Sequence, residues 1–183
     1  MKLDRSKAVL VVLDVQERLM PMIDGAAGVE ANVERLIRGC HSLGMPAIVT
    51  EQYSKGLGVT VAGIRRALEE SGGYRPIEKS CFSAHGCAGF EAELESLERT
   101  QIVLAGVETH VCLYQTAMDL LRDEYDVTIV ADAVSSRAAE NKAIALQRLT
   151  AEGVKISSTE MVLFELLVNA GTDEFRAISK LIK

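Results

Sequence analysis

The chain has 183 residues, of which 48% are hydrophobic, 25% are charged and only 4% are aromatic. Its 20 basic and 26 acidic residues give a formal net charge of −6, which argues against nucleic acid or an anionic membrane as the main partner, because both bind cationic surfaces. The high apolar content and the presence of only 3 prolines exclude a disordered chain. We therefore expect residues 1–183 to form a single domain.

The cysteines at positions 40, 81, 87 and 112 are expected to be free thiols. The first residues run directly into an apolar segment without a signal-peptide cleavage pattern, and no apolar stretch approaches the roughly 20 residues that a membrane helix needs. These features predict a cytoplasmic protein. In a reducing compartment each cysteine has to be judged as core filler, metal ligand or nucleophile.

Short runs rich in Val, Ile and Leu alternate with longer segments of helical periodicity, and turn residues separate them. The runs predict six strands, at residues 8–13, 46–50, 75–79, 101–105, 127–131 and 154–157, and residues 172–183 predict a surface helix. Strands that are joined by helices form a parallel sheet covered on both faces. The predicted fold class is therefore α/β, with three layers and a doubly wound, mostly parallel sheet of six strands.

Reactive side chains stand where three of the predicted strands end. Asp14 follows the first strand, Lys79 ends the third, and Gly106 leads from the fourth into a segment that contains Cys112. In an open α/β sheet, ligands bind beyond the carboxyl ends of the strands. The sequence therefore predicts that a carboxylate, an ammonium group and a thiol meet at one edge of the sheet.

The segment around Cys112 predicts an activated thiol. Thr109 is the expected N-cap of a helix, which would put Cys112 in the first turn. Unpaired backbone N–H groups and the positive end of the helix dipole favour a thiolate there, so we expect a lowered pKa for Cys112. The same N–H groups can stabilise an oxyanion. Cys112 is therefore the predicted nucleophile.

Three motifs together resemble a known family. They are LDVQ at Asp14, EKS at Lys79 and GVETHVCL at Cys112, in the family's order and spacing. With them the chain is similar to the isochorismatase-like cysteine hydrolases, which include nicotinamidases and N-carbamoylsarcosine amidase, and residues 51–58 resemble the isochorismatase-domain branch. The resemblance covers nearly the whole chain. It implies a small-molecule substrate and a homo-oligomer.

The resemblance also implies a mechanism with a Cys112, Asp14 and Lys79 triad and no cofactor. Cys112 would attack an electrophilic carbon and form a thioester-type intermediate that water hydrolyses. Asp14 would take the thiol proton and pass it to the leaving group, and Lys79 would stabilise the thiolate. The backbone N–H groups of Glu108 and Cys112 match the family's oxyanion hole, beside a cis peptide expected between Val107 and Glu108.

Two departures from family members narrow the expected reaction. Nicotinamidases bind a metal through an Asp-x-His pair after the second strand, where this chain has Glu51, Gln52 and Tyr53, so we expect no metal site. Isochorismatases that cleave a vinyl ether lack a nucleophilic cysteine at the position of Cys112. The expected reaction is therefore hydrolysis of a small amide or carbamoyl C–N bond.

Several further residues are candidates for the pocket. They are Gln16, Gln52, Tyr53, Phe82, Val107, Thr109 and Tyr114. The glycine-containing segment 56–58 suits either a lid or a turn. Cys81, His85 and Cys87 lack the paired spacing of a zinc site, and His110 suits a wall or structural role because helical positions i and i+2 do not face each other.

Two other classes of function compete with the hydrolase. A scaffold protein would retain the pocket without turnover, and the family branch has members without a known substrate. A thiol sensor would need a resolving cysteine, for which Cys81 is the candidate. The presence of all three motif residues favours the hydrolase.

Overall fold

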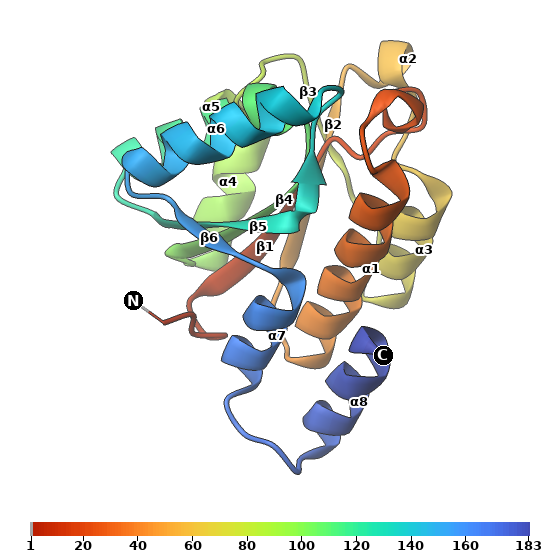
Figure 1. Cartoon of the computed structure of the whole chain (residues 1–183), viewed down its shortest axis with the longest axis vertical. Coiled ribbons are helices and arrows are strands. Elements are labelled where there is room, and N and C mark those ends of the chain that lie inside the picture. Colours follow the sequence, from red (N-terminus) through yellow and green to blue (C-terminus); the bar gives the residue numbers. More distant parts are fainter. Residues whose placement is uncertain (1) are drawn as a thin grey trace.

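A six-stranded parallel sheet forms the centre of the computed structural model, which describes residues 2–183 (Figure 1). The strands are β1 (Ala8–Leu13), β2 (Ala47–Gln52), β3 (Ile77–Lys79), β4 (Gln101–Val107), β5 (Asp126–Ser135) and β6 (Lys155–Ser157). Their order in the sheet is β3-β2-β1-β4-β5-β6, and every neighbouring pair is parallel. The predicted fold class is confirmed, with a sheet that is wholly rather than mostly parallel. The strand order reverses between β1 and β4, which is where ligands bind in such sheets.

Helices cover both faces of this sheet (Figure 1). The helices that share one core cluster with β1 are α1 (Ala26–Ser42), α3 (Ala62–Glu70), α7 (Thr159–Leu167) and α8 (Asp173–Ile182). The other cluster contains residues of α4 (Ala88–Leu97), α5 (Tyr114–Arg122) and α6 (Ala139–Ala151). Shorter helical turns are η1 (Met20–Met22), α2 (Ser54–Leu57), η2 (Ala84–Gly86) and η3 (Thr109–Leu113).

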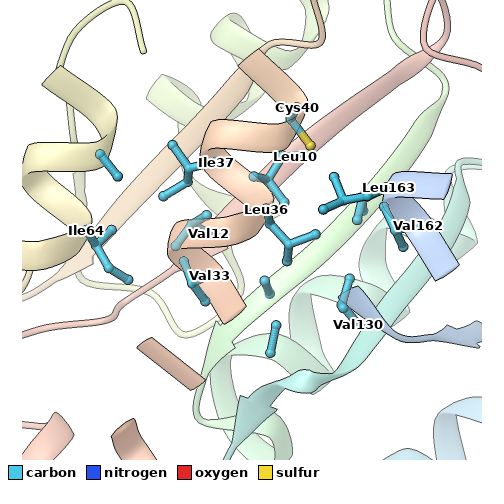
Figure 2. Packing of buried hydrophobic residues seen from close by; sticks show 14 of the residues in the cluster. Leu10, Val12, Val33, Leu36, Ile37, Cys40, Ile64, Val130, Val162 and Leu163 are labelled. Atoms are coloured by element: carbon cyan, nitrogen blue, oxygen red, sulfur yellow. The ribbon is translucent and has the colours of Figure 1, made fainter. Parts of the chain in front are cut away.

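The central strand β1 is buried along its whole length, because it packs against helices on both sides. Leu10 and Val12 belong to the cluster with α1, and Val9 and Val11 belong to the opposite cluster. Figure 2 shows the first cluster, where Leu36 from α1 lies among side chains of the sheet and of α7. Each fully buried aliphatic side chain of this kind contributes about 1.5–3 kcal/mol. The aliphatic composition thus builds a sheet buried on both faces.

Strand ends differ from the prediction at the carboxyl edge of the sheet. β2 continues past Thr50 to Gln52 because these residues pair with β3. β5 ends at Ser135, four residues beyond the predicted end, because its pairing with β4 resumes at Val134 after a register shift between Leu104 and Gly106. β3 begins only at Ile77, after a proline that has no N–H to donate.

Gly106 brings β1 and β4 close together at this edge. Its φ is +111°, and a Cβ added there would lie 2.1 Å from the carbonyl oxygen of Leu13. Only glycine tolerates both the positive φ and the close backbone. The contact sets Asp14, the next residue of the chain, beside the segment that leads to Cys112.

The predicted C-terminal helix is present as α8. Thr172 caps it, because its Oγ1 accepts a hydrogen bond from the Phe175 N–H at 3.0 Å. One face is buried through Ile178, which joins the core of α1 and α7. Within residues 2–183, none of the helices is both long and apolar enough to cross a membrane.

Candidate active site

A fully buried ion pair lies at the carboxyl edge of the sheet. The Lys79 Nζ donates a hydrogen bond to Asp14 Oδ2 at 2.8 Å, and neither side chain has any exposed surface. The Thr50 hydroxyl donates to the other carboxylate oxygen at 2.7 Å. The three groups come from neighbouring strands: Asp14 directly follows β1, Thr50 lies within β2, and Lys79 ends β3. The predicted meeting of Asp14 and Lys79 is therefore observed.

The ammonium group of Lys79 has further acceptors that hold it in place. It donates to Gln52 Oε1 at 2.7 Å and to the carbonyl oxygen of Phe82 at 3.2 Å, with that of Cys81 at 3.4 Å. A buried charge is tolerable only when it is paired and hydrogen-bonded. The loop after β3 therefore compensates Lys79 and fixes the direction of its contact with Asp14.

Cys112 lies beside this pair in η3, which is a π-helical turn. The N–H of Leu113 donates to the carbonyl oxygen of Glu108 at 3.3 Å, five residues back, and the N–H of Val111 donates to the same oxygen at 3.1 Å. Glu108 is the N-cap, so the prediction that Thr109 caps this helix is wrong by one residue. The Thr109 hydroxyl is buried without a hydrogen-bond partner in residues 2–183. Such π turns are frequent at functional sites.

The pKa of the Cys112 thiol is raised to about 12, mainly by burial and then by the negative charge of Asp14, while Lys79 acts in the opposite direction. Cys112 is only 7% exposed, and Asp14 and Lys79 both lie close enough to act on the pKa of its thiol. The prediction of a lowered pKa is therefore wrong, because burial outweighs the helix terminus and the cation. At neutral pH the resting thiol keeps its proton, with a carboxylate beside it that can accept it.

Glu108, next to the turn that contains Cys112, is held at both ends. Its peptide bond with Val107 is cis, as the resemblance implied. Its Oε2 accepts hydrogen bonds from the backbone N–H of Arg137 at 2.9 Å and from the Arg137 Nε at 3.0 Å. The backbone that carries the expected oxyanion hole is thus tied to the segment after β5.

Comparison with known proteins agrees with this geometry. A model of the isochorismatase domain matches residues 8–161. The chain belongs to the isochorismatase family. Membership supports a hydrolase role for this isochorismatase-family protein.

Similar proteins are spread over distant organisms. The secreted isochorismatase effector Isc1 of Phytophthora sojae is 38% identical over 178 residues, which are 96% of this chain and 84% of the relative. Isochorismatase domain-containing protein 2 of Danio rerio is 38% identical over 182 residues, which are 99% of this chain and 89% of the relative.

Solved structures also share the fold. The MAR1 ribonuclease from Caenorhabditis elegans has a TM-score of 0.90 and 32% identity, covering 100% of this chain and 92% of that one. The Escherichia coli YcaC gene product, described as an octameric hydrolase of unknown specificity, has a TM-score of 0.91 at 21% identity, covering 100% of this chain and 89% of that one. At that identity the second likeness shows the fold alone.

In this isochorismatase-family site, Gln16 and Gln52 are structural links. Gln16 is buried, donates to the carbonyl oxygens of Gln52 and Gly58, and accepts the Gln52 N–H at 2.8 Å. Gln52 contacts Lys79 and donates to the Ser80 carbonyl oxygen at 2.9 Å. The segment 56–58 belongs to the end of α2 and the turn after it, and Gln16 ties that turn down.

The aromatic candidates separate into exposed and packed residues. Tyr53 and Phe82 are 58% and 54% exposed. Both are hydrogen-bonded to Lys79 through their backbones: the Tyr53 N–H donates to the Lys79 carbonyl oxygen at 2.9 Å, and the Phe82 carbonyl oxygen accepts from Lys79 Nζ at 3.2 Å. Tyr114 instead packs beneath the guanidinium of Arg148, 4.7 Å from the ring centroid. Val107 is fully buried in the core. Tyr53 and Phe82 are therefore the candidates that a ligand can reach.

The residues considered for a metal have other partners. The Glu51 carboxylate accepts hydrogen bonds from the Thr60 N–H at 2.6 Å, from the Thr60 hydroxyl at 2.9 Å and from the Tyr74 hydroxyl. His85 contacts Asp123 Oδ2 at 2.8 Å. Throughout residues 2–183, no group of three or more His, Cys, Asp and Glu side chains is arranged to hold a metal ion.

Two site residues escape sequence reasoning. Thr50 lies inside β2, and only its register opposite Leu13 puts its hydroxyl against Asp14. Arg137 follows β5 and resembles an ordinary exposed arginine in the sequence. The pairing of Val107 with Ser135 is what brings it to Glu108. A strand register of this kind cannot be read from one sequence.

Proposed function

We propose that this protein is a hydrolase of small amide or carbamoyl C–N bonds that acts through a covalent thioester-type intermediate on Cys112. The observation that carries the proposal is the buried Asp14–Lys79 pair beside a buried thiol. A carboxylate held by a cation in this way is placed to move protons to and from sulfur. Buried ionisable groups with a specific charge partner are common at functional sites.

In the first half of the reaction, Asp14 accepts the thiol proton as the Cys112 sulfur attacks the carbonyl carbon. The carbonyl oxygen becomes an oxyanion, which the backbone N–H groups of Glu108 and Cys112 stabilise. Asp14 returns the proton to the leaving nitrogen, the C–N bond breaks, and an amine departs. Because the resting thiol has a pKa of about 12, proton transfer accompanies the attack rather than preceding it.

In the second half, water attacks the thioester carbon while Asp14 accepts a proton from that water. The C–S bond breaks, the sulfur recovers the proton, and the acid product leaves. Lys79 keeps the Asp14 carboxylate oriented through both halves. The exposed Tyr53 and Phe82 suit the rim of a pocket for a small molecule.

A homo-oligomer in the reducing cytoplasm remains our expectation for the assembly and location. The octameric state named for YcaC supports an oligomer for this fold. One relative is named as a secreted effector, so location differs within the family. Hydrolysis of RNA, which the name of the Caenorhabditis elegans structure suggests for that protein, suits this chain poorly, because its net charge is −6 and Lys79 is already paired.

Turnover of a panel of small amides and carbamoyl compounds tests the proposal. Cys112→Ser is expected to lower turnover by at least about a thousandfold without unfolding the protein, since the nucleophile is lost. Cys87→Ser is the matched control and keeps wild-type turnover. Full activity in Cys112→Ser contradicts the proposal. An inert panel together with an unreactive Cys112 supports the scaffold alternative instead.

A further inference from the structure

The carboxylate of Glu108 is buried, yet its partner reaches it from the surface. Glu108 is 7% exposed, whereas the side chain of Arg137 is 57% exposed. Both hydrogen bonds from Arg137 go to the same oxygen, Oε2, at 2.9 and 3.0 Å. The pair raises the pKa of Arg137, mainly through the side-chain hydrogen bond and then through the charge of Glu108. A buried carboxylate without such a partner would be strongly destabilised.

The backbone of Glu108 is held by hydrogen bonds as well as its side chain. Its carbonyl oxygen accepts the N–H groups of Val111 and Leu113, so the turn that contains Cys112 holds one end of the residue. Arg137 holds the other end through the side chain. With both ends held, the direction of the Glu108 N–H relative to Cys112 is determined.

The segment that presents Arg137 is itself anchored. Ser135 pairs with Val107 across the sheet, and its hydroxyl donates to the Asp24 carbonyl oxygen at 2.7 Å. The Ser136 carbonyl oxygen accepts the Asp24 N–H at 3.0 Å, and the Ser136 hydroxyl contacts His110 Nδ1 at 3.0 Å. These links connect the segment to the sheet, to the loop before α1 and to η3. Arg137 therefore acts from a rigid base.

We propose that Arg137 is a positioning residue, which holds the Glu108 carboxylate and thereby aims the Glu108 backbone N–H at the oxyanion that forms during attack by Cys112. The inference rests on the proposed function, because it presumes that a carbonyl is attacked. Arg137 does not touch the reacting atoms in this role. Its loss should weaken steps that generate an oxyanion and spare steps that do not.

Two reagents separate these steps without knowledge of the natural substrate. p-Nitrophenyl acetate acylates the thiol: sulfur bonds to the carbonyl carbon, an oxyanion forms and collapses, the C–O bond breaks, and p-nitrophenolate leaves while Asp14 takes the thiol proton. Iodoacetamide alkylates the thiol: sulfur bonds to the methylene carbon, iodide leaves and Asp14 takes the thiol proton, and no oxyanion forms on the carbonyl oxygen. The ratio of the two rates at Cys112 therefore measures oxyanion stabilisation.

Release of p-nitrophenolate gives the acylation rate and peptide mass spectrometry gives the alkylation rate at Cys112, with Cys112→Ser as the background. Arg137→Ala is expected to lower acylation about 10- to 100-fold and to leave alkylation within about twofold, because removal of an oxyanion-hole donor costs on the order of 100- to 1,000-fold and here the donor is only misaligned. Arg137→Lys restores acylation to within about fivefold. Glu108→Gln, which keeps the shape but not the charge, shows the same selective loss.

Arg176→Ala is the matched control, since Arg176 is also exposed and paired with a carboxylate, that of Asp173 on α8. It leaves both rates unchanged. Equal losses of acylation and alkylation in Arg137→Ala, or no loss in either rate, would overturn the positioning role. A wild-type Cys112 that reacts with neither reagent overturns the proposed function itself, which is a distinguishable result.

Discussion

Cys40 and Cys112 are both buried thiols, and the pKa of each is raised to about 12. Cys40 lies in α1 within the apolar cluster of Figure 2, where burial is the cause of its raised pKa. Cys112 lies at the carboxyl edge of the sheet, where Asp14 and Lys79 also act on it. The same resting pKa thus arises in two different surroundings.

The comparison shows that a raised or lowered pKa does not identify a nucleophile in this protein. Cys40 belongs to an apolar core cluster, and among residues 2–183 no charged side chain contributes to the shift of its pKa. Cys112 has a carboxylate to take the proton and a cation to hold that carboxylate. In the proposed function, the reactivity of Cys112 therefore depends on the Asp14–Lys79 pair beside it.

Removal of the Lys79 cation should have the largest effect on the difference in reactivity between Cys112 and Cys40. Lys79→Met leaves the Asp14 carboxylate buried without its ion-pair partner, which is expected to lower the free energy of unfolding by about 3–5 kcal/mol. The same change should reduce alkylation of Cys112 by iodoacetamide to the slow rate of Cys40. Urea unfolding and peptide mass spectrometry measure the two effects.

A double variant separates the stability effect from the chemical one. Lys79→Met combined with Asp14→Asn removes both charges, so most of the lost stability should return, to within about 1–2 kcal/mol of the wild type. Alkylation of Cys112 should stay slow, because neither the base nor the cation is present. Wild-type alkylation in either variant would show that the ion pair is not what distinguishes Cys112 from Cys40.

The sequence predicts the sheet well where burial alone decides the structure. β1 has the predicted bounds, because every residue from Ala8 to Leu13 is apolar and buried on one face of the sheet or the other. The ends of β2 and β5 are missed, since polar residues such as Glu51 and Asp132 look like loop residues. In the structure their carboxylates accept hydrogen bonds from Thr60 and from Thr159. Partners that are distant in sequence therefore extend those strands.

The sequence predicts that three residues meet at the carboxyl edge of the sheet, but it predicts neither their electrostatics nor the residues that support them. Asp14, Lys79 and Cys112 are found because motifs mark three strand ends. The direction of the Cys112 pKa shift is missed, because local reasoning counts the helix terminus and cannot count the burial that the rest of the chain imposes. Arg137 is missed because its contact with Glu108 depends on the register of β5 against β4.

A smaller effect on the difference between Cys112 and Cys40 is expected when the Lys79 ammonium group loses one hydrogen-bond acceptor. Gln52→Leu removes the Oε1 acceptor at 2.7 Å from Lys79 Nζ, and a hydrogen bond to a charged group contributes about 1.5–3 kcal/mol. Because Gln52 is partly exposed, we expect a loss of about 1–2 kcal/mol of stability and a few-fold slower alkylation of Cys112. Gln147→Leu, at an exposed position of α6, is the control and should change neither measurement. Unchanged alkylation in Gln52→Leu would mean that Asp14 and the loop carbonyl oxygens hold Lys79 without Gln52.

The smallest expected effect is a decrease in the free energy of unfolding at alkaline pH, to which both thiols contribute. The folded protein holds each thiol proton up to a pKa of about 12, whereas the unfolded chain releases it near 9.0. The resulting stability is complete below pH 9 and is lost as the pH rises from 9 towards 12. Between pH 8 and pH 10 each thiol should therefore cost about 1 kcal/mol, at 1.36 kcal/mol per pKa unit.

Urea unfolding at pH 8 and pH 10 measures the slope of this decrease. Cys40→Ala and Cys112→Ala should each flatten it by about 1 kcal/mol, and Thr150→Ala, which removes no titrating group, should leave it unchanged. Equal flattening means that both thiols are protonated at rest, so that Asp14 and Lys79 alone account for the reactivity of Cys112. A slope that persists in Cys112→Ala and disappears in Cys40→Ala means that Cys112 is already a thiolate at neutral pH. In that case the N-terminus of η3 and Lys79 outweigh burial, and attack needs no proton transfer to Asp14.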